Sequence, residues 1–143
     1  MATNDATSLL AALRSAGLKA TPQRLAIVDC LAGDATHPTA QEVYERLRDR
    51  FPTMAVATVY NTLSALDSIG HCRRLEMGGA IRFDPNGSPH DHAVCEQCGA
   101  IRDVAIAEPE RSQPRGGQLL SGFRVDRVER IYRGVCARCA AAD

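Results

Sequence analysis

The chain has 143 residues and carries 17 basic and 17 acidic side chains, which gives a formal net charge of zero. The balance holds in each half, with eight basic and eight acidic residues in 1–80 and nine of each in 81–143. Net charge therefore does not indicate nucleic-acid binding. No stretch reaches the roughly 18 apolar residues of a membrane span, and the N-terminus lacks the pattern of a secretory signal. We therefore expect a cytoplasmic globular protein without membrane contact, with one large or two small domains.

The first half reads as helices. Residues 7–16 form the first, and Thr21-Pro22 supplies an N-cap and a first-turn proline to the second, in which Leu25, Val28 and Leu31 follow at helical spacing. Thr39-Ala-Gln-Glu42 is a capping box that opens the third helix. A fourth begins near Ala55 and ends before Gly70, with Val59, Leu63 and Leu66 on one face.

A hairpin follows these helices. Residues 72–77 and 80–84 flank Gly78-Gly79, and a two-residue glycine connection favours a tight turn between antiparallel strands. Helices followed by a hairpin are the outline of a winged helix-turn-helix, in which the helix at 55–68 would enter the major groove of DNA. Its outward face carries Thr58, Tyr60, Asn61 and Ser64. A plain helical bundle with a polar face fits the same pattern, and the pattern alone does not decide between them.

The second half has a different character. Residues 85–89 are a turn-rich linker, and 93–107 and 123–135 read as strands of a half-buried sheet. Pro114 and Gly116-Gly117 leave room for only a helical turn or two, near 117–121. We therefore predict an α+β protein with a domain of helices and a hairpin at 1–84, a linker at 85–89 and a small α/β domain at 90–143; whether the first domain is a winged helix-turn-helix stays open at this point.

Four cysteines form two Cys-x-x-Cys pairs, Cys95–Cys98 and Cys136–Cys139. One tight turn lets such a pair present two sulfurs to one ion, and two pairs complete a tetrahedron of thiolates around zinc. The alternatives are a redox dithiol or unrelated thiols, but paired motifs in a reducing compartment favour structural zinc. Cys30 and Cys72 remain, and we expect both to be ordinary small core or strand residues.

A second group of potential ligands carries nitrogen and oxygen only. His90 and His92 share one face of an extended segment, and the turn at Cys95–Cys98 could fold Asp103 back beside them. Asp84 precedes the linker and His37 precedes the capping-box helix. Such a set suits Fe(II), Mn(II) or Zn(II). His71 has no visible ligand partners, and we expect it to lie on the surface or to face DNA.

One alternative comes from a different class of protein. His-x-His followed by an aspartate eleven residues later is also the spacing of a zinc-dependent isopeptidase motif. That motif carries serine where this chain has Ala100, and no suitable general-base glutamate is evident upstream. A metallohydrolase is thus a remote alternative.

The sequence resembles the ferric-uptake-regulator (Fur) family of bacterial repressors along residues 10–139. The matching motifs occur in the family's order, and they are Gly17-Leu-Lys-Ala-Thr-Pro-Gln-Arg24, His37-Pro-Thr-Ala-Gln-Glu-Val-Tyr44, Ala57-Thr-Val-Tyr-Asn-Thr-Leu63, Arg82-Phe-Asp84, His90-Asp-His92, Cys95-Glu-Gln-Cys98-Gly99 and Gly134-Val-Cys-Ala-Arg-Cys139.

This resemblance implies a winged helix, a C-terminal α/β dimerisation domain and a homodimer that binds palindromic operators in double-stranded DNA. It also implies that Tyr60 contacts bases, that Lys19 reaches the minor groove and that Arg24 contacts phosphates. Thr58 and Asn61 are further candidates for DNA contact on the same helix.

Within the family, the set His37, Asp84, His90, His92 and Asp103 resembles the peroxide-sensing branch, since iron sensors usually carry glutamate at the positions of Asp84 and Asp103. The implied mechanism is that Fe(II) or Mn(II) joins the two domains, and that peroxide reacting at bound Fe(II) oxidises His37 or His92. An iron-, manganese- or zinc-uptake repressor without this trigger is the alternative.

Two departures from the family pattern are visible. Members often carry a histidine shortly before the last Cys-x-x-Cys, in an additional metal site, whereas this chain has Val128-Glu-Arg-Ile131. We therefore expect that site to be absent. The shortened region 108–121 puts its share of the dimer interface in doubt.

Overall fold

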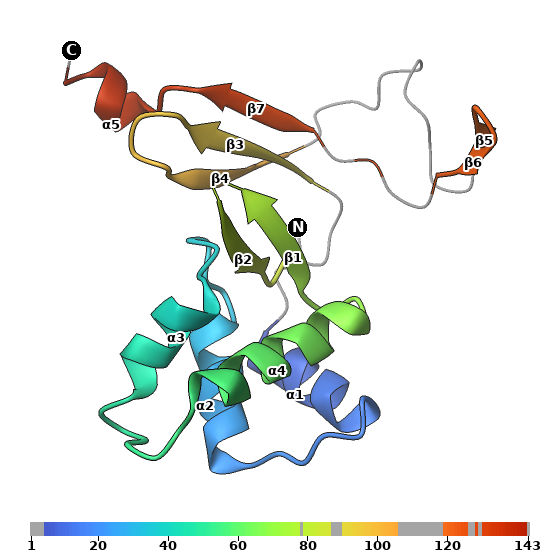
Figure 1. Ribbon diagram of the computed structural model, residues 1–143, viewed down its shortest axis with the longest axis vertical. Helices are drawn as coiled ribbons and strands as arrows, with labels where there is room; N and C mark the ends of the chain where they lie inside the picture. Colours follow the sequence, from blue (N-terminus) through green and yellow to red (C-terminus); the bar gives the residue numbers. More distant parts are fainter. Residues whose placement is uncertain are drawn as a thin grey trace. The chain divides into compact units, whose positions relative to one another are not determined.

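The computed structural model describes residues 5–77, 79–86, 90–105, 119–125, 128 and 130–142. The chain divides into two compact units, Met1–Ser88 and Pro89–Asp143. Unit 1 contains helices and one hairpin, and unit 2 contains a small sheet and a short helix (Figure 1). Within the described residues, no helix has the length and apolar character that crossing a bilayer requires.

Unit 1 is a winged helix, as the sequence predicts. Its elements are α1 (Ala6–Ser15), α2 (Pro22–Leu31), α3 (Ala40–Leu47), α4 (Val56–Ser68), β1 (Arg73–Met77) and β2 (Ala80–Asp84). The predicted caps are present, since the Thr21 hydroxyl accepts a hydrogen bond from the Arg24 amide and Thr39 forms the full capping box with Glu42. In the antiparallel hairpin Met77 lies opposite Ala80, which leaves the expected two-residue connection.

One buried apolar cluster holds unit 1 together. Its fully buried members include Leu9 and Leu13 from α1, Leu63 from α4 and Phe83 from β2, and each such side chain contributes about 1.5–3 kcal/mol of transfer free energy. The predicted face of α2 is partly wrong, because Leu25 is 37% exposed. The residues that α2 buries are Ala26, Ile27, Val28 and Leu31.

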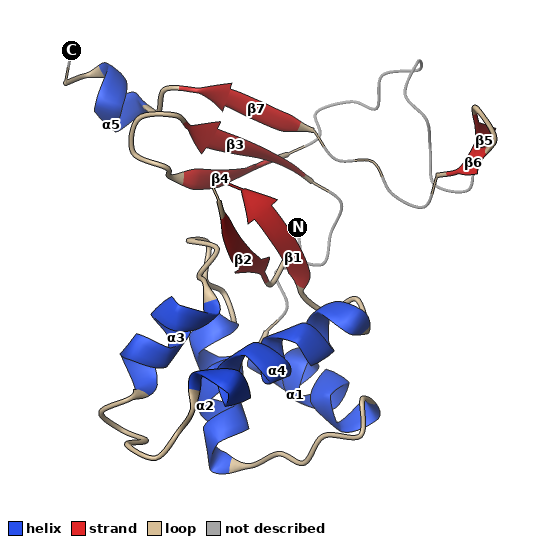
Figure 2. Ribbon diagram, in the orientation of Figure 1, coloured by secondary structure: helices blue, strands red, loops and turns tan. Residues whose placement is uncertain are grey.

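Unit 2 is built on a three-stranded sheet. The strands are β3 (Asp91–Cys95), β4 (Ile101–Val104) and β7 (Ile131–Gly134), in the order β4-β3-β7, and α5 (Ala137–Ala140) follows the last strand (Figure 2). β3 pairs antiparallel with β4 and parallel with β7. The region 93–107, expected to be extended, is thus divided into β3 and β4 by the Cys-x-x-Cys turn, where the chain was expected to fold back.

A second hairpin corrects two further predictions. β5 (Leu119–Leu120) and β6 (Phe123–Arg124) pair around Ser121 and Gly122, which both have positive φ. The short helix expected near 117–121 is therefore wrong for 119–121, since a left-handed turn interrupts any helix there, while 117 and 118 lie outside the described residues. The expected strand at 123–135 is likewise divided between β6 and β7. Phe123 is 76% exposed, so the expected half-buried sheet is also wrong at this residue.

Candidate metal centres and nucleic-acid interface

The four paired cysteines form one cluster in unit 2. The Sγ atoms of Cys95, Cys98, Cys136 and Cys139 all lie within 4.8 Å of one another, and those of Cys98 and Cys136 are 3.8 Å apart. Zinc–sulfur bonds of about 2.3 Å in a tetrahedron place neighbouring sulfurs about 3.8 Å apart. The cluster therefore fits zinc, and four sulfurs in one group fit a metal better than two separate redox dithiols.

Local backbone geometry explains how the two pairs meet. In the first turn Gly99, at φ +75°, donates its N–H to the Cys95 carbonyl, and Cys95 donates to the carbonyl of Ala100. The second pair follows β7, which lies beside β3 in parallel, so both strands end at the same edge. The Glu96 N–H donates to the Gly134 carbonyl at 2.8 Å and joins the two ends.

Backbone amides prepare one of these thiols for a cation. The Cys136 N–H donates to the Cys95 sulfur at 3.3 Å, and this hydrogen bond, with that of the Cys98 amide, lowers the pKa of the Cys95 thiol to about 6. A hydrogen bond with Cys136 raises the pKa of Cys139 to about 12. Because zinc binds thiolates, its binding at this cluster would release the protons that the thiols carry.

Unit 1 presents two of the predicted nitrogen and oxygen ligands side by side. The Nε2 atom of His37 lies 3.5 Å from the Oδ2 atom of Asp84, and both side chains are buried. The other carboxylate oxygen, Oδ1, accepts the Asn86 N–H at 2.9 Å, which fixes the direction of the Asp84 side chain.

The pairing of His37 with Asp84 results from how β2 passes the loop before α3. The Phe83 N–H donates to the Pro38 carbonyl at 2.9 Å, and the Arg82 guanidinium donates to the His37 carbonyl at 3.1 Å. His37 itself has φ +55°, a left-handed conformation that is strained for a residue with a Cβ. Such strain is kept where surrounding structure enforces it, often at ligand-binding positions.

Unit 2 presents the other three predicted ligands together. The Nε2 atoms of His90 and His92 are 3.1 Å apart, and the Asp103 Oδ1 atom lies 3.2 Å from the first and 3.5 Å from the second. His92 on β3 pairs directly with Asp103 on β4, which brings their side chains together. The predicted fold-back of the chain at the Cys-x-x-Cys turn is thus confirmed.

The distances within both groups match the edges of a metal coordination polyhedron. Bonds of about 2.1 Å give ligand separations of about 3.0 Å in an octahedron and about 3.4 Å in a tetrahedron. The four separations run from 3.1 to 3.5 Å. Imidazole nitrogens and carboxylate oxygens at these distances fit Fe(II), Mn(II) or Zn(II).

Two of the predicted DNA contacts border one cavity in unit 1. Arg24 at the start of α2 and Thr58 on α4 both line a cavity of about 490 Å³, with Thr21, Pro22, Gln23 and Phe51. The Arg24 guanidinium also donates to the Lys19 carbonyl at 2.9 Å, so these two basic residues are neighbours.

The expected outward face of α4 needs correction. Asn61 is exposed, but Thr58, Tyr60 and Ser64 are half-buried. The Tyr60 ring packs edge-on against Phe83, with 6.3 Å between ring centroids. Only part of this tyrosine is therefore available to a partner.

Sequence reasoning missed several residues that support the ligands. The sequence motif Arg82-Phe-Asp84 predicted a ligand role for Asp84 alone. Arg82 and Phe83 bind the carbonyls of His37 and Pro38, about 45 residues earlier in the chain. His71 is half-buried rather than fully on the surface. No local signal predicts such long-range contacts.

Comparison with known proteins agrees with this geometry. The model of the ferric uptake regulator family matches residues 15–129. The peroxide-responsive repressor PerR of Staphylococcus aureus is 40% identical over 131 residues, which cover 91% of this chain and 88% of that protein. PerR from Streptococcus pyogenes is 32% identical with a TM-score of 0.52, covering 95% of this chain and 94% of that one. The manganese-bound ferric uptake regulator of Pseudomonas aeruginosa is 28% identical with a TM-score of 0.66, covering 89% and 96%.

Proposed function

Because the chain belongs to the ferric uptake regulator family of metal-dependent, DNA-binding, dimeric repressors, we propose that it is a repressor that senses hydrogen peroxide. It is a transcription regulator and not an enzyme, so the metallohydrolase alternative is wrong. The identity of 40% to a peroxide-responsive repressor, over nine-tenths of the chain, supports the peroxide trigger.

The four-cysteine cluster would hold a structural zinc ion. Four thiolates leave no open coordination position, which argues against a catalytic zinc. The ion would tie the end of β7 and α5 to the turn between β3 and β4, and so contribute directly to the folding of unit 2.

The regulatory site would form when one ion binds ligands from both units. Unit 1 offers His37 and Asp84, and unit 2 offers His90, His92 and Asp103, each group with the spacing of metal ligands. The presence of one incomplete ligand set in each unit is the observation that supports the proposal. A metal bound by all five residues favours only the arrangement of units that satisfies them all, and thereby shifts the population toward the DNA-binding state.

The peroxide response would act on a ligand side chain. The His37 or His92 imidazole would gain one oxygen atom from hydrogen peroxide and supply both electrons, while the second peroxide oxygen would leave as water. Fe(II) held by the ligand set would supply the chemistry that activates the peroxide. An oxidised imidazole is a poorer ligand, so the two units lose their link and the operator is released. Mn(II) would support DNA binding without this oxidation.

The DNA partner would be a palindromic operator bound by a homodimer, with α4 in the major groove. Tyr60, Asn61 and Thr58 would face bases, Arg24 phosphates and Lys19 the minor groove. Exposed Ile131 and Tyr132 on β7, at an edge of its described sheet, offer a strand surface for a second copy.

The deciding experiment compares Fe(II)-loaded and Mn(II)-loaded protein after micromolar peroxide. We expect one histidine of the iron form to gain one oxygen in peptide mass spectra while operator binding is lost, and the manganese form to keep both. Equal responses of the two forms would exclude the peroxide trigger and favour a metal-uptake repressor.

A substitution tests the shared site. We expect His37→Ala to abolish the gain in operator affinity that Mn(II) produces, because unit 1 would lose its imidazole ligand. His71→Ala is the matched control and should keep the ratio of affinities with and without Mn(II). An unchanged ratio in His37→Ala would contradict the five-ligand site.

A further inference from the structure

An ion pair between the buried Asp91 and the half-buried Arg130 in unit 2 has no part in the proposed ligand sets. Asp91 is 3% exposed, and both of its carboxylate oxygens are bound by Arg130. The Arg130 Nε–H donates to Oδ2 at 3.1 Å, and the Arg130 backbone N–H donates to Oδ1 at 3.2 Å. Side chain and backbone of one residue thus bind the same carboxylate.

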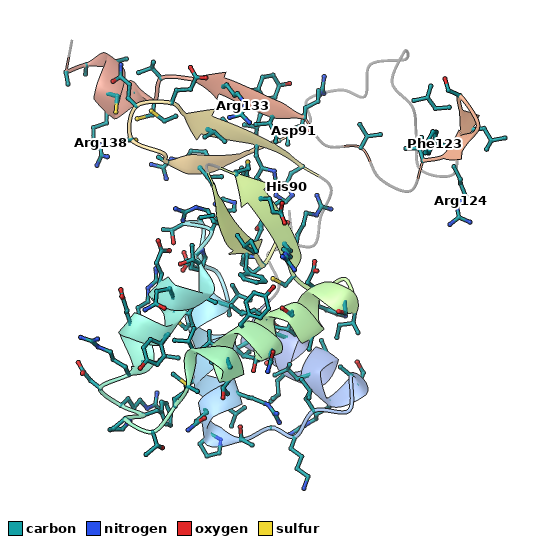
Figure 3. All side chains as sticks on the ribbon, in the orientation of Figure 1. His90, Asp91, Phe123, Arg124, Arg133 and Arg138 are labelled. Carbon is teal, nitrogen blue, oxygen red and sulfur yellow. The ribbon has the colours of Figure 1, made fainter. Side chains whose placement is uncertain are left out.

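This ion pair sits within the histidine motif. Asp91 is the first residue of β3 and lies between His90 and His92 in the sequence. Figure 3 labels His90 and Asp91. Because side chains alternate along a strand, Asp91 points to the opposite face from His92. The His92 N–H also donates to the Arg130 carbonyl at 3.1 Å. Arg130 therefore binds two successive residues of β3, through the carboxylate of Asp91 and the backbone N–H of His92.

The topology of unit 2 explains why such a tie matters. β7 pairs with β3, but the 26 residues 105–130 separate the end of β4 from the start of β7. No short loop therefore fixes the register between β3 and β7. A slip of β7 by one residue along β3 would turn the β7 side chains to the other face of the sheet and move Arg130 away from Asp91, whereas the Cys-x-x-Cys turn holds β3 to β4. His90 lies just before β3, so its position depends on how firmly the first residue of the strand is held.

We propose that the Asp91–Arg130 ion pair is a positioning device that holds His90 and His92 in place for the regulatory metal. This inference rests on the proposed function of these histidines as ligands. Residues that orient ligands from outside the coordination sphere commonly change metal affinity by about 10- to 100-fold when they are replaced.

The test measures Mn(II) affinity of the zinc-loaded, full-length protein. We expect Arg130→Met to bind Mn(II) about tenfold more weakly, and Arg130→Lys, which keeps a cation beside Asp91, to restore most of the affinity. Simple electrostatics predicts the opposite sign, since removing a positive charge favours a cation. Co(II) in the same site should show altered d–d absorption in Arg130→Met, which a general loss of stability would not produce.

Two further variants make the result decisive. Arg102→Met removes an exposed arginine from the same face of the sheet, where it pairs with Ala93, and should leave Mn(II) affinity and the Co(II) spectrum unchanged. Asp91→Leu with Arg130→Met removes both charges, so net charge is kept and no buried carboxylate is left unpaired. We expect this double variant to fold and still to bind Mn(II) more weakly.

The outcomes separate this inference from the proposed function. If wild type and His92→Ala bind Mn(II) equally, the regulatory site itself is wrong. If His92→Ala loses affinity while both Arg130→Met and the double variant match wild type in affinity and Co(II) spectrum, only the positioning role is overturned.

Discussion

The ring and the hydroxyl group of Tyr60 can be considered separately, the ring for packing within unit 1 and the hydroxyl for the proposed contact with DNA. The ring packs edge-on against Phe83 and lies 5.9 Å from the Arg74 guanidinium. Phe83 is fully buried and precedes Asp84, a proposed metal ligand, in β2. The ring therefore belongs to the packing between α4 and the hairpin, and the proposed base contact would be made by the hydroxyl.

This division predicts different effects for two substitutions of Tyr60. Tyr60→Phe should lower operator affinity about tenfold, as expected for one lost base contact, while affinity for non-specific DNA and the free energy of unfolding stay near wild type. Tyr60→Ala should also destabilise unit 1, because the edge-to-face contact is lost. Binding titrations and urea unfolding measure the two effects. Equal operator affinity of Tyr60→Phe and wild type would contradict the base contact.

Cys72 should be chemically inert in the folded protein. It is 4% exposed, and burial, with the nearby charges of Asp67 and Asp84, raises the pKa of its thiol to about 12. Only the thiolate reacts, and a pKa of about 12 keeps the thiol neutral as pH rises from neutral to mildly alkaline. Iodoacetamide should therefore label half-buried Cys30 before Cys72, as peptide mass spectra would show. Equal labelling rates of Cys72 in buffer and in urea would refute this expectation.

At the scale of elements, α3 begins at Ala40, three residues after the strained residue His37, a proposed metal ligand. The Thr39 hydroxyl accepts the Glu42 N–H, and the Glu42 carboxylate accepts the Thr39 N–H, both at 3.1 Å. The same carboxylate lies 3.6 Å from the Arg82 guanidinium, which also binds the His37 carbonyl. The start of this helix and the ligand loop thus share hydrogen bonds.

Removing the cap should cost a measurable part of the stability of unit 1. We expect Thr39→Ala to lower the free energy of unfolding by about 1 kcal/mol, measured by urea unfolding followed through the helical circular dichroism signal. Thr39→Ser keeps the accepting hydroxyl and is the matched control, with an expected loss of only a few tenths of a kcal/mol or so. A loss as large in Thr39→Ser would place the effect outside the cap.

The elements that sequence reasoning predicted well are those with local signals. The capping box at Thr39, the proline at the start of α2 and the glycine connection after Met77 each act within a few residues. The exposed face of α2 was harder to predict, because apolar residues occur all around this helix. The turn at Ser121-Gly122 was missed, since only the backbone shows its left-handed conformation.

The candidate ligands likewise include some that local sequence motifs predict and some contacts that only the fold reveals. The histidine and cysteine motifs are visible from spacing alone, and the strand register brings His92 to Asp103. The tie between Asp91 and Arg130 joins residues 39 positions apart, and the contact between Phe83 and the loop at Pro38 is longer still. Such contacts depend on the fold as a whole, which spacing along the chain does not reveal.

At the scale of the whole molecule, the two units are stabilised in different ways. The apolar cluster of unit 1 includes fifteen buried residues between Leu9 and Phe83. In the described part of unit 2, the buried apolar side chains are Val94, Cys95 and Ile101, and the exposed ones include Leu119 and Phe123. A sheet with so thin a core needs another source of folding free energy, and structural zinc supplies on the order of 10 kcal/mol in small domains.

Loss of zinc should therefore unfold unit 2 while unit 1 remains folded. We expect Cys98→Ser with Cys139→Ser to lose zinc, the dispersed amide resonances of β3 and β4 and the dimer, while keeping the resonances of α1 to α4. His92→Ala removes a ligand of the regulatory set alone, so it should keep zinc and both sets of resonances. NMR spectra, zinc content and sedimentation measure these effects. Because the thiolates join the ends of β3 and β7, a zinc-free variant with unchanged β3 resonances would mean that the sheet holds without the ion.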